Sequence, residues 1–448
     1  MLGGGIGGFD ASASFILFPE VRDTIANGDG AAASWVLTIG GIVGAAVLLQ
    51  AGRLADRFGH HRLFAAGVSI FTVSCLAAAV APNLFILVVM RAVQAIGLAV
   101  MGPSSVAIIV DSSPEGTHSK SLGTWGAVTA IAGVIAPPTI AVLVEVGSWP
   151  AAYLSFALVG VVVAAVSLPG ATTGEITPAA SEPDLLGAAS MMTGLGLLVL
   201  GLVEGNGWGW LTTRTVGVLV SSMILVGFTV ARSRTQADPV VPLDLLKRRN
   251  VFLASIVGLV TAIAFFAHWV VMLALLTDLW GVALLPAALL LSLMPGTMAL
   301  FATAAGRLID TVGFRRVMVP GALVYSLLFL VPVFFIGPER NWFLLVPALI
   351  GAGIGMATVW PALTGVGTQH LPSDRLATAS AVIHTFLRIG GALGSAIAVA
   401  WVAAGTPGAT ATHRNPIWLL VVGGLLIALG SLGFREGATE VDPKRVVA

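Results

Sequence analysis

Fourteen stretches of about 20 mostly apolar residues follow one another along the chain, and this succession constrains the fold more than any other feature. A helix of about 20 residues, rising 1.5 Å per residue, crosses the roughly 30 Å hydrocarbon core of a bilayer. The sequence therefore predicts an all-α polytopic membrane protein. The predicted spans are residues 2–20, 34–52, 62–82, 84–107, 121–144, 150–168, 185–205, 214–231, 251–276, 284–304, 315–336, 342–366, 376–404 and 416–434.

The composition excludes several other classes of protein. Only 10% of the 448 residues are charged and 57% are hydrophobic, whereas a soluble domain carries about 25% charged residues. A soluble enzyme and a disordered protein are therefore excluded, and the net charge of +1 gives no reason to expect a nucleic-acid partner. Because Cys75 is the single cysteine and no histidine pair has suitable ligand spacing, we expect no metal and no cofactor.

The basic residues predict the orientation of the spans. Sixteen of the 22 lysines and arginines flank the spans on the side of the N-terminus, and four flank the other side. The remaining two, Arg91 and Arg388, lie inside spans. By the positive-inside rule, both termini are expected in the cytoplasm. The first span lacks the basic lead-in and the uninterrupted apolar core of a signal peptide, so we interpret it as a membrane helix. The missing lead-in leaves open whether the true N-terminus starts upstream of Met1.

An internal repeat divides the chain. Residues 52–62 and 306–316 are identical at six of eleven positions, and they follow the second and the tenth span in predicted short cytoplasmic loops. Two six-helix halves flanking two inserted helices are an arrangement of transporters that rock around a midplane site. The predicted units are an N-terminal bundle (1–170), a linker with the two inserted helices (171–250), a C-terminal bundle (251–436) and a cytoplasmic tail (437–448).

Several motifs carry a family resemblance. Residues 52–62 resemble the loop 2–3 signature of the major facilitator superfamily. Four further segments resemble helix signatures of its fourteen-helix drug:proton antiporters (EmrB/QacA-like), namely residues 10–19, 91–97, 184–187 and 387–394. The resemblance implies the major-facilitator fold in a bacterial inner membrane. It also implies a secondary transporter that exports small apolar or cationic compounds in exchange for protons by alternating access.

One departure from the family pattern keeps alternatives open. In the fifth-helix signature Pro137 is present, but Ala136, Ile140 and Ala141 replace glycines. An importer or facilitator of a specific metabolite is therefore the first alternative. A proton-translocating subunit of a respiratory complex is another, although such subunits resemble chains with lysines buried in the membrane, and all three lysines here lie in predicted loops. No nucleophile–base set and no nucleotide-binding Gly-x-x-x-x-Gly-Lys motif is present, so we expect neither an enzyme nor an ATP-driven pump.

Two charged residues inside spans are the candidates for proton coupling. Asp10 lies about eight residues into the first span and Arg91 about seven into the fourth, which places them roughly 8 Å apart along the membrane normal. A carboxylate at such a depth costs at least about 2.5–3.5 kcal/mol and tends towards its protonated form. Asp10 is thus a candidate proton carrier or cation contact, and Arg91 would tune its proton release through a bridging water. The alternative is that both only hold helices together.

The repeated segment predicts a conformational latch, in which arginines pair with carboxylates of the facing bundle and Asp56 caps the next helix. The alternative is a topology signal alone. The latch candidates are Gly52, Arg53, Asp56, Arg57, Gly59, Arg62, Asp310, Arg315 and Arg316. The cavity candidates are Gln94, Trp125, Pro137, Trp360, His384 and Arg388. We expect a monomer whose partners are a small-molecule substrate, protons and the lipid bilayer, with no catalytic residue.

Overall fold

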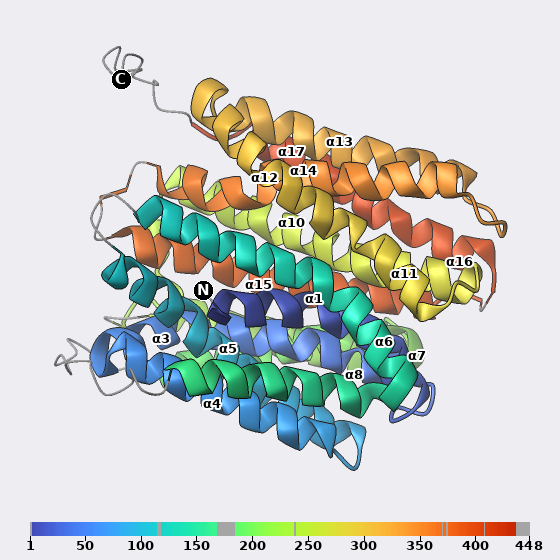
Figure 1. The fold of residues 1–448 in the computed structure, drawn as a ribbon, viewed down its shortest axis with the longest axis horizontal. Coiled ribbons are helices and arrows are strands. Elements are labelled where there is room, and N and C mark those ends of the chain that lie inside the picture. The colour runs from blue at the N-terminus through green and yellow to red at the C-terminus, as the bar shows by residue number, and fades with distance from the viewer. Residues whose placement is uncertain are drawn as a thin grey trace.

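Helices that run along the long axis of the molecule make up the fold (Figure 1). The computed structural model describes residues 2–113, 118–167, 184–236, 239–369, 371–372, 375–406 and 408–435, and these contain no β-strand. The all-α prediction is therefore confirmed. The elements are α1 (Leu2–Asp23), α2 (Gly30–Ala33), α3 (Trp35–Phe58), α4 (His60–Ala79), α5 (Leu84–Ser112), α6 (His118–Ser167), α7 (Leu185–Trp208), α8 (Thr213–Arg232), α9 (Leu243–Leu246), α10 (Arg249–Ala274), the π-helix η2 (Leu275–Leu279), α11 (Leu284–Leu291), α12 (Leu293–Val312), α13 (Phe314–Phe335), α14 (Trp342–Thr368), α15 (Leu376–Ala403), α16 (Thr410–Arg414), the 3₁₀ helix η4 (Asn415–Ile417) and α17 (Trp418–Ser431).

Twelve helical stretches of the described residues are long and apolar enough to cross a bilayer. The count differs from the predicted fourteen in two places. Helix α1 is not among the twelve, because its glycines and Asp10 lower its hydropathy. The stretch Thr124–Val166 combines two predicted spans, which meet at the non-helical residue Ser148 (φ 61°). Fourteen spans therefore remain a prediction, as does the cytoplasmic location of the termini.

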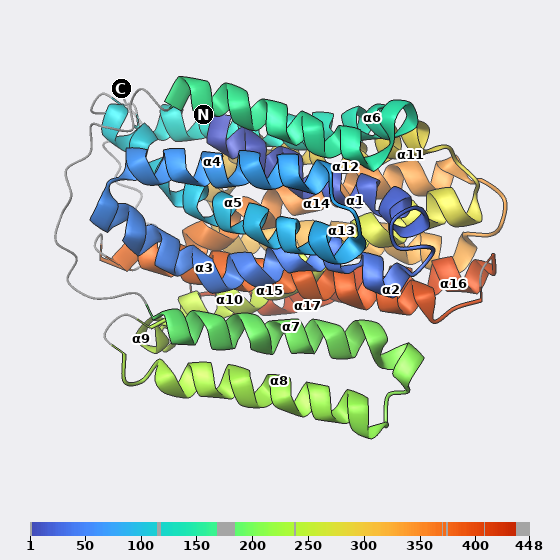
Figure 2. The same ribbon diagram turned by 90° about the horizontal axis from the view of Figure 1, so that it is seen from below.

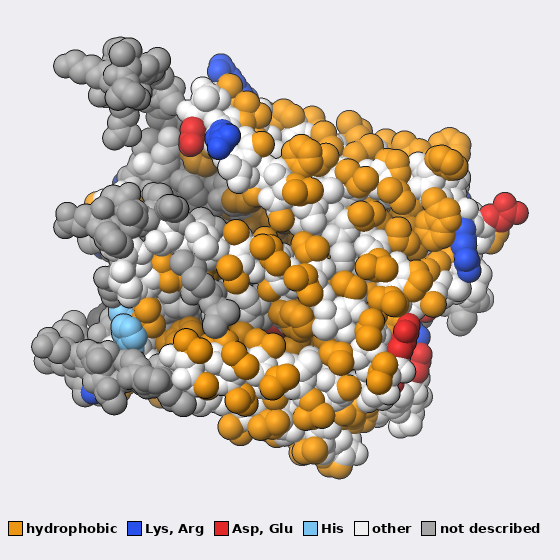
Figure 3. Space-filling view, viewed as in Figure 1, with side chains coloured by type: hydrophobic (Ala, Val, Ile, Leu, Met, Phe, Trp, Pro, Cys, Tyr) orange, Lys and Arg blue, Asp and Glu red, His pale blue; other side chains and the backbone are white. Residues whose placement is uncertain are grey.

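The side surface of the molecule suits a lipid environment. Hydrophobic side chains are spread along the middle of the face in Figure 3, and the visible charged side chains gather towards the two ends of the long axis. Large apolar side chains such as Val146, Leu300 and Phe343 are largely exposed. An apolar surface of this extent would be unfavourable in water, whereas hydrocarbon accepts it without cost.

Glycines determine how closely α1 packs on α6. A Cβ added at Gly8 would collide with the backbone carbonyl oxygen of Thr129 on α6. A Cβ at Gly4 would collide with the side chains of Trp125 and Thr129. Small residues are the usual means by which membrane helices approach this closely. The glycine-rich start of the chain therefore places Asp10 beside α6 and the centre of the molecule.

The internal repeat forms the same turn twice, but it is not a loop. Helix α3 continues through the repeated segment to Phe58, and Gly59 (φ 89°) alone separates it from α4. In the second half, Gly313 (φ 90°) separates α12 from α13 in the same way. Only glycine adopts such a φ readily. The prediction of a loop at residues 52–62 was wrong, because polar residues beyond the bilayer core still have adequate helix propensity. Helix α3 therefore extends past the end of its apolar stretch.

Helices α7 and α8 form a hairpin at the side of the molecule (Figure 2). Helix α7 packs on α3 and α15, and α8 packs mainly on α7. Asp184 joins the two helices, since its Oδ1 accepts from the backbone N–H of Gly187 at 2.9 Å and pairs with Nε of Arg232 at 2.8 Å. The position is compatible with an insertion between two halves, and the predicted unit boundaries stay a prediction.

Candidate functional site

A buried polar network joins α1 to α3 and α5. Asp10 is 8% exposed and Arg91 is 5% exposed. Nη1 of Arg91 donates to Oδ1 of Asp10 at 2.7 Å and to Oε1 of Gln94 at 2.6 Å. Its Nη2 donates to the Ser14 hydroxyl at 2.8 Å, and its Nε donates to the Val36 carbonyl at 3.3 Å. Nε2 of Gln94 also donates to Oδ1 of Asp10, at 3.1 Å. Five hydrogen bonds thus fix one carboxylate and one guanidinium together.

The network differs from the prediction in one respect. We expected a water between Asp10 and Arg91, but the two side chains are in direct contact. Oδ2 of Asp10 accepts no hydrogen bond from the described residues, and the side chain keeps 12% of its surface exposed. One carboxylate oxygen is therefore occupied and the other is open to a proton. Ser14 was missed, although its position one turn after Asp10 was the available signal.

The network forms part of the wall of a cavity of about 330 Å³. Helices α1, α3, α5 and α6 line it on one side, and α10, α14 and α15 line it on the other. Gln94 is buried behind Asp10 and Pro137 is buried within α6, so neither lines the cavity. The predicted site residues that line it are Asp10, Arg91, Trp125, Trp360, His384 and Arg388.

His384 and Arg388 occupy the α15 wall one turn apart. His384 is exposed despite its position in the middle of a membrane helix, because it faces the open cavity. Arg388 is half-buried, and it forms no hydrogen bond or ion pair with any residue that the structure describes. Its guanidinium lies over Gly44 of α3, where an added Cβ would come within 2.5 Å of Nη1. The absence of a side chain at Gly44 therefore makes room for this charge.

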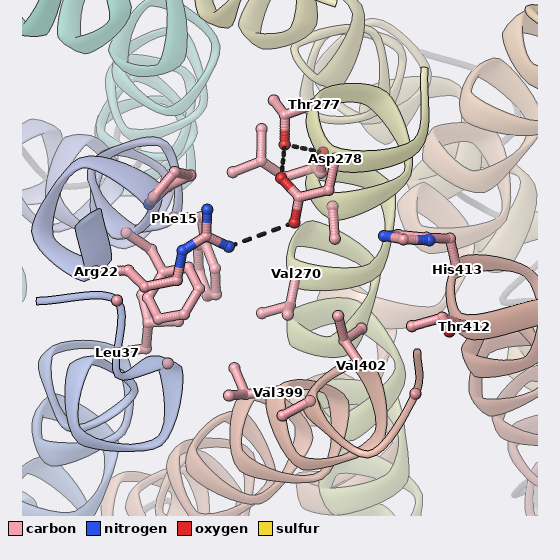
Figure 4. A pocket seen from close by; sticks show the side chains of 18 of the residues that line it. Phe15, Arg22, Leu37, Val270, Thr277, Asp278, Val399, Val402, Thr412 and His413 are labelled. Carbon is pink, nitrogen blue, oxygen red and sulfur yellow. Dashed lines mark hydrogen bonds and ion pairs between the residues drawn. The ribbon is translucent and has the colours of Figure 1, made fainter. Parts of the chain in front are cut away.

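A second cavity, of about 470 Å³, lies at the other end of α1. Figure 4 shows Arg22 of α1 reaching Asp278 of η2 across it, with Nη1 and Oδ2 3.3 Å apart. A hydrogen bond to Asp23 and the charge of Asp278 raise the pKa of Arg22, which lies beyond the predicted span, so the guanidinium stays charged. The ion pair joins two distant parts of the sequence. Sequence reasoning missed it, since both residues resemble ordinary solvated helix ends.

Aromatic side chains lie between the two cavities. Phe15 and Leu37 line both of them. The ring of Phe15 packs against Phe266 at 5.7 Å and stacks on Trp269 at 5.8 Å between ring centroids. These contacts connect α1 to α10 and leave an apolar layer beyond Asp10 on the side of the Arg22–Asp278 pair.

Comparison with known proteins identifies the family. The model of the Major Facilitator Superfamily matches residues 1–395 and, in a second match, residues 254–445. The chain belongs to the major facilitator superfamily. The predicted family and fold are thereby confirmed, and this major facilitator protein is a multi-pass membrane transporter and not an enzyme.

Several relatives of this major facilitator protein are named for drug resistance. The Tetracenomycin C resistance and export protein of Streptomyces glaucescens is 26% identical over 356 residues, which cover 78% of this chain and 65% of that protein. The multidrug resistance protein Stp of Mycobacterium tuberculosis is 24% identical, over 88% of this chain and 74% of its own. The probable multidrug resistance protein EmrY of Escherichia coli is 24% identical, over 81% and 71%. The chain thus spans 65% to 74% of the length of these relatives.

Solved structures of other transporters share the fold. A peptide transporter POT in complex with alafosfalin superposes with a TM-score of 0.69 at 16% identity, over 97% of this chain and 94% of that one. The nucleoside transporter NupG superposes with a TM-score of 0.65 at 13% identity, over 97% and 98%. At these identities the similarity concerns the fold alone.

The predicted latch of this major facilitator chain is only partly described. The side chains of Arg53, Asp56 and Arg57 lie outside the described part of the structure. Gly52 and Gly59 lie at the end of α3 and in the turn that follows, and Arg62 is exposed at the start of α4. Asp310, Arg315 and Arg316 are exposed at the equivalent turn between α12 and α13. The latch function remains a prediction.

Proposed function

We propose that this protein exports small apolar compounds across a bacterial inner membrane in exchange for protons. The buried network of Asp10, Arg91 and Gln94 in the cavity wall carries the proposal. The names of the resistance and export relatives support the direction of transport. Of the two predicted substrate classes, apolar and cationic, the cavity favours the first, because two arginines and one carboxylate line it.

Protonation of Asp10 is the proposed coupling step. The ionised carboxylate accepts from Arg91 and Gln94 through Oδ1, while Oδ2 is free to take a proton. A proton there cancels the charge that holds Arg91 and weakens the link between α1 and α5. A hydrogen bond to a charged group contributes about 1.5–3 kcal/mol, and a change of that size alters a two-state population at least tenfold.

Alternating access follows from the two cavities. The cavity at Asp10 extends to Gly3 and Gly4 at the start of α1, which the positive-inside rule assigns to the cytoplasmic side. The aromatic layer at Phe15 and the Arg22–Asp278 pair close the other side. Rocking of the two halves would break these contacts and expose Asp10 to the opposite side.

Transport by an Asp10→Asn variant in proteoliposomes tests the coupling. Asn keeps the shape of the side chain but cannot take up a proton. We expect uphill export driven by an imposed pH gradient to fail, while exchange of labelled for unlabelled substrate continues. Glu339→Gln, which neutralises an exposed acid outside the cavity, is the matched control. Unchanged uphill export by Asp10→Asn would remove this residue from the mechanism.

A facilitator or importer of a specific metabolite is the second candidate function. The observation in its favour is the altered fifth-helix signature, in which Ala136, Ile140 and Ala141 replace glycines and are all fully buried in α6. The same proteoliposomes distinguish the two functions. A facilitator would equilibrate its substrate at the same rate with and without a pH gradient, and it would never accumulate the substrate.

A further inference from the structure

The cavity contains one positive charge without a partner. Arg91 and Asp10 neutralise each other in direct contact. Arg388 forms no hydrogen bond or ion pair with the described residues, although Asp10 is near enough to attract it. Of the half-buried arginines, Arg22 and Arg232 each bind a carboxylate, whereas Arg414 of α16, which does not line this cavity, binds none that the structure describes. Arg388 differs because it lies inside a predicted membrane span, where an unpaired charge away from water is unfavourable. A ligand at this position would remove that cost.

The surroundings of Arg388 are arranged for an incoming group. Gly44 leaves room for the guanidinium on α3, since an added Cβ would lie 2.5 Å from Nη1 and 3.0 Å from Cδ. His384, one turn earlier on α15, is exposed to the same cavity. Residues four apart on a helix share a face. Two hydrogen-bond donors of one helix can therefore converge on a single acceptor group.

The remaining walls are aromatic. Trp125 of α6 and Trp360 of α14 line the cavity from its two sides, and Phe15 and Phe266 line it from α1 and α10. A cavity of about 330 Å³ with such walls and few polar groups suits a ring compound. A permanently cationic ring compound would be repelled by the positive charge of Arg388. The carboxylate of Asp10 would not compensate for this repulsion, because Arg91 already neutralises it.

We propose that the cavity binds an aromatic compound with an acidic group, such as a carboxylate, and that Arg388 and His384 hold this group. A hydroxyl or amine at the other end of the ligand donates to Oδ2 of Asp10. Protonation of Oδ2 removes that acceptor, so ligand and proton exclude each other, as exchange requires. The inference changes the substrate class of the proposed function from apolar compounds in general to apolar ring compounds that carry one acidic group, and it rests on the proposed function in taking this cavity as the substrate site.

Equilibrium binding of two dyes to the detergent-purified full chain tests the proposal by fluorescence polarisation. Fluorescein carries a carboxylate, whereas rhodamine 123 has a similar ring system with a methyl ester and a positive charge. We expect fluorescein to bind at least tenfold more tightly. Arg388→Gln should weaken fluorescein binding at least tenfold, because a hydrogen bond to a charged group is lost. Binding of rhodamine 123 should stay the same or become tighter, because the repelling positive charge is removed. Arg388→Lys should retain part of the preference, since Lys keeps the charge without the planar fork.

A matched pair of glycine variants keeps the proposal testable if Arg388→Gln folds poorly. Gly44→Ala should displace the guanidinium and weaken fluorescein binding, while Gly196→Ala, at an open position on α7 outside the cavity, should not. Preference for rhodamine 123, binding of neither dye, or equal loss of both in Arg388→Gln would overturn the proposal. Because no gradient is present, these results concern the substrate class alone. Intact dye selectivity without gradient-driven export would instead contradict proton exchange.

Discussion

At the scale of single residues, Gln94 explains how a charged pair is tolerated beside the cavity. Its amide accepts a hydrogen bond from Arg91 through Oε1 and donates one to Asp10 through Nε2. Each member of the ion pair therefore has a second hydrogen-bond partner in Gln94. A buried ion pair is stable only when its remaining hydrogen-bonding groups are occupied. Here Oδ2 of Asp10 is the oxygen left open, so the proposed proton exchange would depend on this single atom.

The planar fork of Arg91 leads to the first prediction. Its three nitrogens donate to Asp10, Gln94, Ser14 and the Val36 carbonyl, and Lys cannot reach all of them with one ammonium group. We expect Arg91→Ala to abolish gradient-driven export and Arg91→Lys to recover a minor part, measured as initial rates in proteoliposomes. Full activity of Arg91→Lys would mean that only charge or topology is required.

At the scale of elements, hydropathy located the helices well but not their ends. The predicted span 284–304 became two helices, α11 and α12, and α12 continues to Val312. Hydropathy measures what can lie in hydrocarbon, whereas hydrogen bonding and capping decide where a helix stops. The depths of Asp10 and Arg91 in their spans predicted that they lie at similar levels along the membrane normal, because each residue of a helix adds about 1.5 Å. The pair of Arg22 and Asp278, 256 residues apart, depends on how distant elements meet, which no local pattern encodes.

The second prediction concerns the α7–α8 hairpin. Asp184 is buried, caps α7 and pairs with Arg232. Loss of a helix cap costs about 1 kcal/mol, and loss of the pair leaves Arg232 without its partner. We expect Asp184→Ala to lower the thermal melting temperature by several degrees and Asp184→Asn, which keeps an oxygen for the cap, to lower it less. Identical melting of wild type and Asp184→Ala would contradict a structural role.

The third prediction tests the latch. Asp56 is the single acid in a basic segment next to the Gly59 turn, and local pairing or capping there would contribute about 1 kcal/mol. Since 1.4 kcal/mol is a tenfold change in population, Asp56→Asn should slow transport severalfold without preventing substrate binding. Cysteines introduced on both sides of the cavity in a Cys75→Ala background would report the changed accessibility. Wild-type rate and labelling would reduce the segment to a topology signal.

The fourth prediction concerns closure at the other end of α1. Arg22 and Asp278 are both partly exposed, so their pair is worth about 0.2–1 kcal/mol. We expect Asp278→Asn to increase labelling of a cysteine placed at Ala274, which lines the cavity behind the pair. Exchanging the charges, Arg22→Asp with Asp278→Arg, should restore the low labelling. If the exchanged pair labels like the single variant, the contact does not close this side.

At the scale of the whole molecule, two cavities separated by an aromatic layer are the observation on which the proposed alternating access rests. The proposed proton site and Arg388 face the same cavity from opposite halves, so in this proposal a bound ligand links the state of one half to that of the other. Proton binding at the open Oδ2 of Asp10 is the central step of the proposal. Coupled movement of proton and substrate is therefore the central claim of the account.

Simultaneous recording of substrate and proton flux tests this claim most directly. Proteoliposomes loaded with a pH-sensitive dye would receive a pulse of substrate in the absence of any imposed gradient. The account predicts that substrate movement in one direction drives protons in the other, and that Asp10→Asn abolishes the proton signal while substrate exchange continues. Substrate transport by the wild-type protein without any proton movement, or an unchanged proton signal in Asp10→Asn, would contradict it.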